Sequence, residues 1–126
     1  MDPIRQTVFT DPKSGKLGNC FNACLASLLE LKLGEVPRFH LMKGNQTKRL
    51  KEFLGKHGYV FHGFVNGSPT GKGVDGFFIA SYEVVNHPPY RHCVIWKDGS
   101  IFHDPRDHFV ELGCDAHHYL DIERKQ

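Results

Sequence analysis

The sequence lacks any long apolar run. No stretch approaches the ~20 consecutive apolar residues that a membrane-spanning helix needs, and Met1–Gln6 contains no apolar segment of the kind that forms a secretion signal. Internal repeats and low-complexity segments are absent as well. We therefore expect no membrane partner, a cytoplasmic location, and a single domain covering residues 1–126.

A strong charge of one sign is also absent. The 16 Lys and Arg residues against 14 Asp and Glu residues give a formal net charge of +2, which is too small to indicate nucleic acid as a partner. Basic residues do gather between Lys43 and Lys56, but they alternate with Leu50, Phe53 and Leu54. We interpret this segment as a helix with a solvated basic face.

Cysteine is scarce, with four residues at Cys20, Cys24, Cys93 and Cys114. Because no secretion signal is present, we expect reduced thiols rather than a disulfide framework. Nine histidines keep both metal binding and acid–base chemistry open. The composition therefore favours an intracellular enzyme with a reactive thiol over a disulfide-stapled extracellular module.

Two helices are indicated in the first half of the chain. Apolar residues recur on one face of a helix that follows Asn19, a good N-cap, and that Gly34 and Pro37 would end. A second helix is expected at about Thr47–His57, with Gly58 as its stop. The apolar face of the first helix consists of Phe21, Cys24, Leu25, Leu28 and Leu29.

Short strands are indicated in the second half, where β-branched and aromatic residues are frequent. We expect Asn66–Gly76 to be a glycine-rich loop and Thr7–Phe9 to be a short extra strand. Because the helices precede the strands, we expect an α+β fold in which N-terminal helices pack on one side of a small antiparallel sheet. The expected strands are Tyr59–Val65, Phe77–Tyr82, His92–Trp96, Ser100–His103 and His118–Ile122.

Cys20 lies in the first turn of the expected first helix. The partial positive charge of a helix N-terminus stabilises a thiolate, and its N–H groups can stabilise an oxyanion. At about 100° per residue, Cys20 lies at the edge of the apolar face and should be partly exposed, whereas Cys24 lies inside that face and should be buried. The position of Cys20 would also suit a small buried apolar residue, so position alone leaves both interpretations open.

A hairpin farther along the chain offers a base and a carboxylate. The segment from His92 to Asp104 is expected to form two strands around Lys97–Gly99. A three-residue loop would place His92 directly opposite Asp104, within reach of an imidazole–carboxylate hydrogen bond. A two-residue loop, Asp98–Gly99, would instead pair Asp104 with Cys93 and turn the carboxylate to the other face. We favour the three-residue loop, because it gives the two side chains a joint role.

These segments resemble the papain-like cysteine peptidase superfamily. Gly18–Leu31 and Gly34–Phe39 are similar to the opening of small bacterial and phage proteins of that superfamily, close to the bacteriocin-processing peptidases. Leu50–Tyr59, His92–Ile95 and His103–Pro105 are similar to later segments of the same proteins. The resemblance implies a papain-like fold and a thiol hydrolase that cleaves a peptide or isopeptide bond in a peptide or protein substrate, without a cofactor.

The resemblance also implies site residues by motif position. Cys20 would be the nucleophile, His92 the base and Asp104 the orienting acid, in the chain order of papain-like enzymes. The family usually has a glutamine before the cysteine that completes the oxyanion hole, and the only upstream glutamine is Gln6, fourteen positions before Cys20. Asn19 is the other candidate for that role.

Three further interpretations stay open. A deamidase or an acyl transferase would use the same Cys, His and Asp residues. A papain-like fold could also serve as a binding or inhibitory module, for example a phage protein that acts on a host factor. A zinc site is the weakest alternative, because Cys-x₃-Cys on a helix is a poorer metal motif than paired Cys-x₂-Cys knuckles, and we expect no metal. Its ligands would come from Cys20, Cys24, His92, Cys93, His103, His117 and His118.

Overall fold

The structure is a computed structural model that describes residues 3–7, 18–39, 46–66, 72–83, 91–106 and 118–125. Its helices are α1 (Cys20–Leu29) and α2 (Gln46–Lys56), with a short 3₁₀ turn, η1 (Leu33–Glu35), between them. The strands are β1 (Tyr59–Val65), β2 (Phe78–Glu83), β3 (Arg91–Lys97), β4 (Ser100–His103) and β5 (His118–Arg124).

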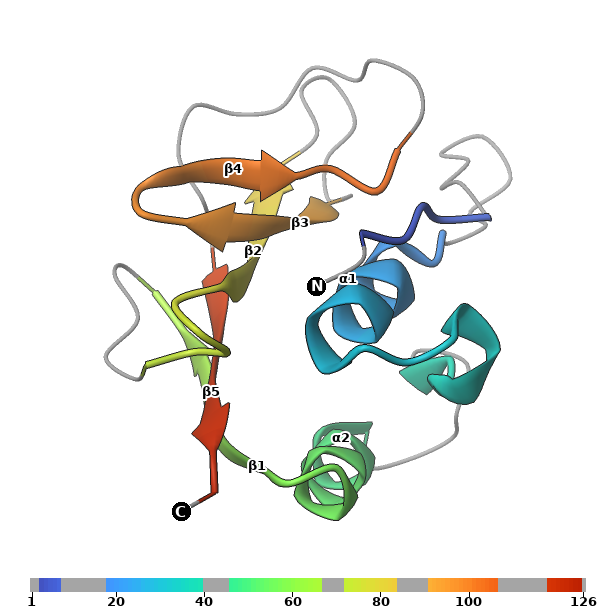
Figure 1. The fold of residues 1–126 in the computed structure, drawn as a ribbon, viewed down its shortest axis with the longest axis vertical. Coiled ribbons are helices and arrows are strands. Elements are labelled where there is room, and N and C mark those ends of the chain that lie inside the picture. The colour runs from blue at the N-terminus through green and yellow to red at the C-terminus, as the bar shows by residue number, and fades with distance from the viewer. Residues whose placement is uncertain are drawn as a thin grey trace.

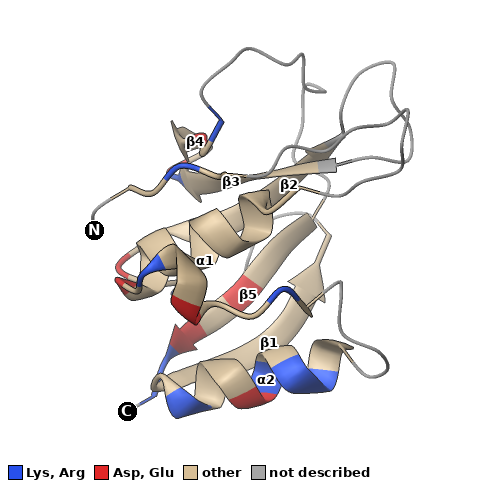
Figure 2. Cartoon of the chain, turned by 90° about the vertical axis from the view of Figure 1, so that its right-hand side faces the viewer, with Lys and Arg blue, Asp and Glu red and all other residues tan. Residues whose placement is uncertain are grey.

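The five strands form one antiparallel sheet in the order β1-β5-β2-β3-β4, so the C-terminal strand is inserted between β1 and β2. Both helices lie on the same face of this sheet (Figures 1 and 2). α1 packs against β3 and β2, and α2 packs against β1. The expected α+β architecture, with helices on one side of an antiparallel sheet, is therefore confirmed.

The core lies between the helices and the sheet. α1 buries most of its length, whereas α2 buries only Leu50 and Leu54. The Lys and Arg residues of α2, coloured blue in Figure 2, are exposed, as expected for a solvated basic face. The main buried cluster consists of Cys24, Leu25, Ala26, Leu28, Val36, Phe39, Leu50, Leu54, Tyr59, Val74, Ile79, Ile95, Leu120 and Ile122.

α1 ends earlier than expected, and the prediction that Gly34 and Pro37 end it is wrong. Glu30 takes a left-handed conformation with φ of 57° directly after the last helical residue. Leu31 N–H then donates to the Ala26 carbonyl at 2.9 Å, which closes the final turn. Local backbone geometry at Glu30, rather than a helix-breaking residue, therefore ends the helix.

Most other element bounds agree with the sequence pattern. β1 and β4 match the expected ranges residue for residue, the remaining strands differ by one or two residues at their ends, and Gly58 follows the end of α2 with φ of 87°. Thr7 forms a bend, and the rest of the expected strand Thr7–Phe9 lies outside the described residues. Neither helix within the described ranges is long and apolar enough to cross a membrane.

Part of the expected Asn66–Gly76 loop is structured. Val74 and Phe77 exchange two backbone hydrogen bonds of 3.0 Å across a turn formed by Asp75 and Gly76. Both turn residues have positive φ, 56° and 86°, as a two-residue hairpin loop requires. Residues 67–71 of this loop are not among the described residues.

The β3–β4 hairpin has a different loop from the one favoured by its sequence. Lys97 pairs with Ser100, so Asp98 and Gly99 form a two-residue loop. Their φ values of 51° and 87° give the left-handed backbone that matches the twist of the flanking strands. The prediction of a three-residue loop is therefore wrong.

Candidate active site

Cys20 is the first residue of α1 and is partly buried. Its sulfur accepts a hydrogen bond from the backbone N–H of Cys93, near the start of β3, over 3.4 Å. Cys24, one turn farther along the helix, has no exposed surface. The expected contrast between a partly exposed Cys20 and a buried Cys24 is therefore confirmed.

His92 and Asp104 are in contact next to Cys20. The distance from His92 Nε2 to Asp104 Oδ1 is 2.6 Å, and because a carboxylate has no proton to give, Nε2 is the donor. His92 also interacts with the Cys20 thiol, because each residue shifts the pKa of the other: His92 lowers that of Cys20, and Cys20 raises that of His92. The three residues singled out in the sequence therefore form one connected set, the Cys20–His92–Asp104 cluster.

A β-bulge in the hairpin brings Asp104 to the same face as His92. The register shifts after Ile95, so that Phe102 is an extra residue on β4. A two-residue loop without a bulge would turn Asp104 away from His92. The extra residue, Phe102, turns Asp104 back to the face of the hairpin that carries His92. The two side chains then lie diagonally rather than directly opposite each other. The expected contact is present, although the register argued for it is wrong.

Arg106 is a fourth member of the site that no sequence pattern indicates. Its Nε–H lies 3.1 Å from each oxygen of Asp104, its backbone N–H donates to Oδ1 at 3.0 Å, and its Nη2 pairs with Oδ2. The Arg106 side chain is only 8% exposed. The one available signal is Pro105, which favours a turn between the two residues. Arg106 therefore holds both oxygens of the carboxylate that faces His92.

The surroundings of the cluster favour charged side chains. Hydrogen bonds from Cys93 lower the pKa of the Cys20 thiol, against an opposing effect of burial and with further help from His92. Burial also disfavours a charged His92, but hydrogen bonds with Asp104 and Cys20 raise the pKa of the ring. Partial burial opposes ionisation of Asp104, yet His92 and Arg106 hold its pKa below the usual carboxyl range. These shifts favour a thiolate–imidazolium pair near neutral pH.

The N-terminal segment brings Gln6 to the cluster. Gln6 is 7% exposed, and its backbone N–H donates to the Pro105 carbonyl at 2.9 Å. The next residue, Thr7, is held by the side chain of Asn19, which immediately precedes Cys20. The segment Gln6–Thr7 thus bridges Asn19, which precedes Cys20, and Pro105, which follows Asp104, although Gln6 is distant from Asp104 in the sequence.

Asn19 has a structural role in this arrangement. It does not cap α1 with its side chain. Its Oδ1 accepts the Thr7 backbone N–H at 3.0 Å, and its Nδ2 donates to Thr7 Oγ1 at 2.9 Å. Both ends of the Asn19 amide therefore hold the N-terminal segment.

An apolar hollow lies between the first turn of α1, the start of α2 and the end of β1. It has a volume of about 240 Å³ and is bordered by Phe21, the residue after Cys20. Phe64 of β1 faces this hollow with 52% of its surface exposed, and its ring lies 6.5 Å from that of Phe21. The lining residues are Phe21, Asn22, Phe39, Gln46, Thr47, Leu50 and Phe64.

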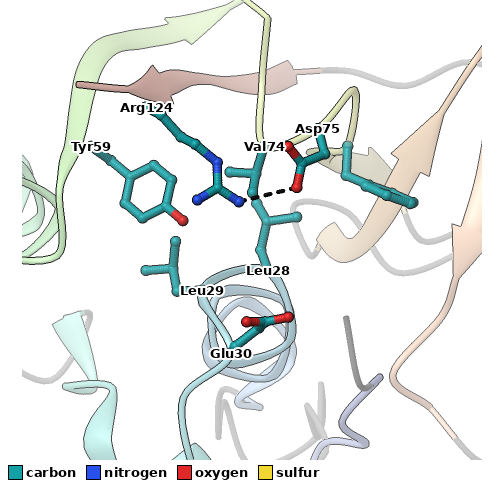
Figure 3. Close-up of a pocket in the computed structure, with 8 residues that line it drawn as sticks. Leu28, Leu29, Glu30, Tyr59, Val74, Asp75 and Arg124 are labelled. Carbon is teal, nitrogen blue, oxygen red and sulfur yellow. Dashed lines mark hydrogen bonds and ion pairs between the residues drawn. The ribbon is translucent and has the colours of Figure 1, made fainter. Parts of the chain in front are cut away.

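A second cavity, of about 220 Å³, lies at the opposite end of α1 (Figure 3). Arg124 lies between the Tyr59 ring and Asp75 there, and its Nη2 donates to Asp75 Oδ2 at 3.0 Å. Glu30, at the end of α1, borders the same cavity. Because a helix rises about 1.5 Å per residue and α1 has 10 residues, this cavity is too distant to take part in chemistry at Cys20.

Neither metal-ligand geometry nor similarity to known proteins assigns a function to this cluster. Within the part of the chain that the structure describes, no group of three or more His, Cys, Asp or Glu side chains is arranged to hold a metal ion, and His117 lies outside that part. Comparison of the chain with protein-family models, curated proteins and solved structures gives no match. A functional assignment therefore depends on the geometry of the Cys20–His92–Asp104 cluster.

Proposed function

We propose that the protein is a papain-like thiol hydrolase that cleaves an amide bond, of the peptide or isopeptide type, in a peptide or protein substrate. The observation that carries this proposal is the connected Cys20–His92–Asp104 cluster at the N-terminus of a buried helix. Its members occur in the chain order Cys, His, Asp that papain-like enzymes use. This chemistry needs no cofactor.

In the proposed reaction the Cys20 thiolate attacks the substrate carbonyl carbon. The tetrahedral intermediate collapses to a thioester as the His92 imidazolium gives its proton to the leaving amine. His92 then takes a proton from the water that hydrolyses the thioester. Asp104 accepts the hydrogen bond from His92 Nε2, so Nδ1 is the ring nitrogen that would exchange the proton with Cys20. Arg106 is a positioning residue, because it holds the carboxylate by both oxygens.

The oxyanion of the tetrahedral intermediate would be held at the first turn of α1. The Cys20 backbone N–H lies at the helix N-terminus, where backbone donors and the helix dipole both favour negative charge. The Gln6 side-chain amide is the proposed second donor. Its support is the burial of Gln6 and its position between the Asn19–Thr7 contact and Pro105.

The apolar hollow suggests which substrates fit. A hollow bordered by Phe21 and Phe64 suits a large apolar side chain near the scissile bond. Cys20, Cys24 and Cys93 are free thiols, so we also propose a reducing compartment, the cytoplasm, as the place where the enzyme works.

Labelling with iodoacetamide and an activity assay together test the proposal. The purified full chain should be alkylated at Cys20 at neutral pH, faster than at Cys24, and Cys20→Ala should lose this fast labelling and all turnover of a peptide or isopeptide substrate. Cys24→Ala is the matched control and should keep both. Release of ammonia instead of a new amine terminus would indicate a deamidase.

Two results would overturn the proposal. One is alkylation of Cys20 no faster than that of an unfolded-chain thiol at the same pH, because the cluster would then not activate the sulfur. The other is a tight complex with a protein target whose effect is undiminished in Cys20→Ser, because the chain would then act as a binding or inhibitory module.

A further inference from the structure

Cys93 is a second thiol at the nucleophile that the proposed reaction does not use. It follows His92 on β3, and because side chains alternate along a strand it faces the opposite way, with Ile95, toward the core under α1. Its backbone N–H donates to Cys20 Sγ at 3.4 Å, and the Cys20 and Cys93 thiols interact, because each shifts the pKa of the other. Two free cysteines that are 73 positions apart in the sequence therefore meet at one contact.

We propose that Cys20 and Cys93 form a reversible disulfide bond when the protein meets a hydroperoxide, which switches the site off and protects its sulfur. The inference rests on the proposed role of Cys20 as the reactive thiol. A disulfide requires Cα atoms within about 7 Å of each other, and a sulfur in contact with the main-chain nitrogen of its partner residue fits that limit. We expect the bond to close by rotation of the two side chains.

The chemistry proceeds in two balanced steps. The Cys20 thiolate attacks one peroxide oxygen, so that an S–O bond forms and the O–O bond breaks. The leaving oxygen takes a proton, which the His92 imidazolium can supply, and departs as an alcohol or water. The Cys93 sulfur then attacks the Cys20 sulfenic acid, an S–S bond forms, and the S–O oxygen leaves as water with the Cys93 proton. The two thiols lose two electrons, and the hydroperoxide gains them.

The two cysteines have complementary properties for these steps. The lowered pKa of Cys20 makes it the thiol that reacts with peroxide, since susceptibility follows thiolate character and access. The pKa of Cys93 is raised, first by its hydrogen bond with Cys20 and then by burial, so it stays a thiol until Cys20 is oxidised. In a reducing cytoplasm such a bond would be transient, as cytosolic disulfides usually are.

Mass spectrometry of the full chain tests this inference. The reduced protein is treated with a few equivalents of hydrogen peroxide, alkylated, digested and mapped. We expect loss of two hydrogen atoms from the intact mass, a cross-link between the peptides that contain Cys20 and Cys93, and full return of both thiols with dithiothreitol. Because Cys24 shares a tryptic peptide with Cys20, the same experiment on Cys24→Ala makes the assignment unambiguous and should give the same cross-link.

Cys93→Ala sharpens the result. Without a resolving thiol, Cys20 should pass to the sulfinic acid, which dithiothreitol does not reverse, and Cys93→Ser repeats the test with a side chain close in size. A wild-type Cys20 that becomes sulfinic acid while Cys93 stays free, or one that cross-links to Cys24, would overturn the inference. If the cross-link forms but the protein shows no hydrolase activity, only the proposed function is overturned. If the protein hydrolyses its substrate but forms no cross-link, only this inference is overturned.

Discussion

Two histidine–carboxylate pairs lie near opposite edges of the same sheet. At the β1 edge, His62 Nε2 lies 2.8 Å from Glu123 Oε1, and at the β4 edge, His92 Nε2 lies 2.6 Å from Asp104 Oδ1. A β-bulge lies next to each pair, in β1 between Phe61 and Gly63 and in the β3–β4 hairpin after Ile95. They differ in surroundings, because the His62 and Glu123 side chains are 41% and 36% exposed, whereas His92 is 7% exposed.

The comparison teaches that an imidazole–carboxylate hydrogen bond alone does not make a site. In water-exposed surroundings such a pair is screened and contributes little. At the β4 edge, the ring is buried, Arg106 holds the carboxylate, and the free nitrogen of His92 meets a thiol at a helix N-terminus. At that edge, hydrogen bonding with Asp104 and then interaction with Cys20 raise the pKa of His92 against the opposing effect of burial, while Cys93 and His92 lower the pKa of Cys20.

The largest expected effect comes from removing each histidine in turn. His92→Ala should lower turnover by about 10²–10⁴-fold, the usual contribution of general acid–base catalysis. It should also move the pH midpoint of Cys20 alkylation upward, because the imidazolium that favours the thiolate is lost. His62→Ala should leave both the turnover and the midpoint unchanged. Steady-state kinetics and iodoacetamide rates measured as a function of pH check these outcomes.

The sign of the pH dependence follows from the two pKa shifts. The Cys20 pKa is lowered and the His92 pKa is raised, so the ion pair persists between the two. It is lost when the thiolate is protonated at low pH and when the imidazolium is deprotonated at high pH. The wild-type alkylation rate should therefore stay high well below the usual thiol pKa. An equal loss of turnover in His62→Ala would contradict the distinction between the pairs.

Local patterns in the sequence predict the parts of the site that depend on one element. The helical period separates Cys20 from Cys24, and strand composition gives most of the strand bounds, because both depend on residues close in the chain. The insertion of β5 between β1 and β2 is not predictable in this way, since it is a long-range pairing. The β3–β4 hairpin shows the same limit, because the sequence indicates a loop within Lys97–Gly99 but neither its true length nor the Phe102 bulge beyond it.

Non-local contacts also explain why Arg106 is missed and why the place of Gln6 is hard to predict. Gln6 is distant from Cys20 in sequence, and only the Asn19–Thr7 contact and the bond to Pro105 bring it back. Arg106 lies two residues after Asp104 without any recognisable motif, and its role depends on burial that the sequence does not reveal. The sequence thus indicates which residue types take part, while the fold decides which of them meet.

The next effect concerns stability. Asp104→Ala should lower the free energy of unfolding at neutral pH by about 2–4 kcal/mol, because it removes the carboxylate that pairs with the buried Arg106 guanidinium. Glu123→Ala at the exposed pair is the matched control and should cost less than about 1 kcal/mol. Urea denaturation of both variants and the wild type, followed by circular dichroism, measures the difference.

The stability gap should depend on pH in one direction. The folded-state pKa of Asp104 is lowered, so its ionised form contributes stability above the unfolded carboxyl pKa and loses it as the pH falls. The wild type and Asp104→Ala should therefore converge in acid. A gap that is the same at neutral and acid pH would mean that Asp104 acts through packing rather than through its charge.

The smallest expected effect concerns Phe64, which shares β1 with His62 and borders the apolar hollow. If the hollow receives an apolar side chain of the substrate, Phe64→Ala removes part of the surface that covers it. The loss of about 1–2 kcal/mol of apolar contact should raise KM about 5–30-fold for a substrate with a large apolar residue near the scissile bond. kcat and the rate of Cys20 alkylation should stay unchanged, because Phe64 does not touch the cluster.

A substrate with alanine at that position is the control, and its KM should change little. Equal increases in KM for both substrates would place the substrate side chain elsewhere, and the β1 edge would then take no part in the site.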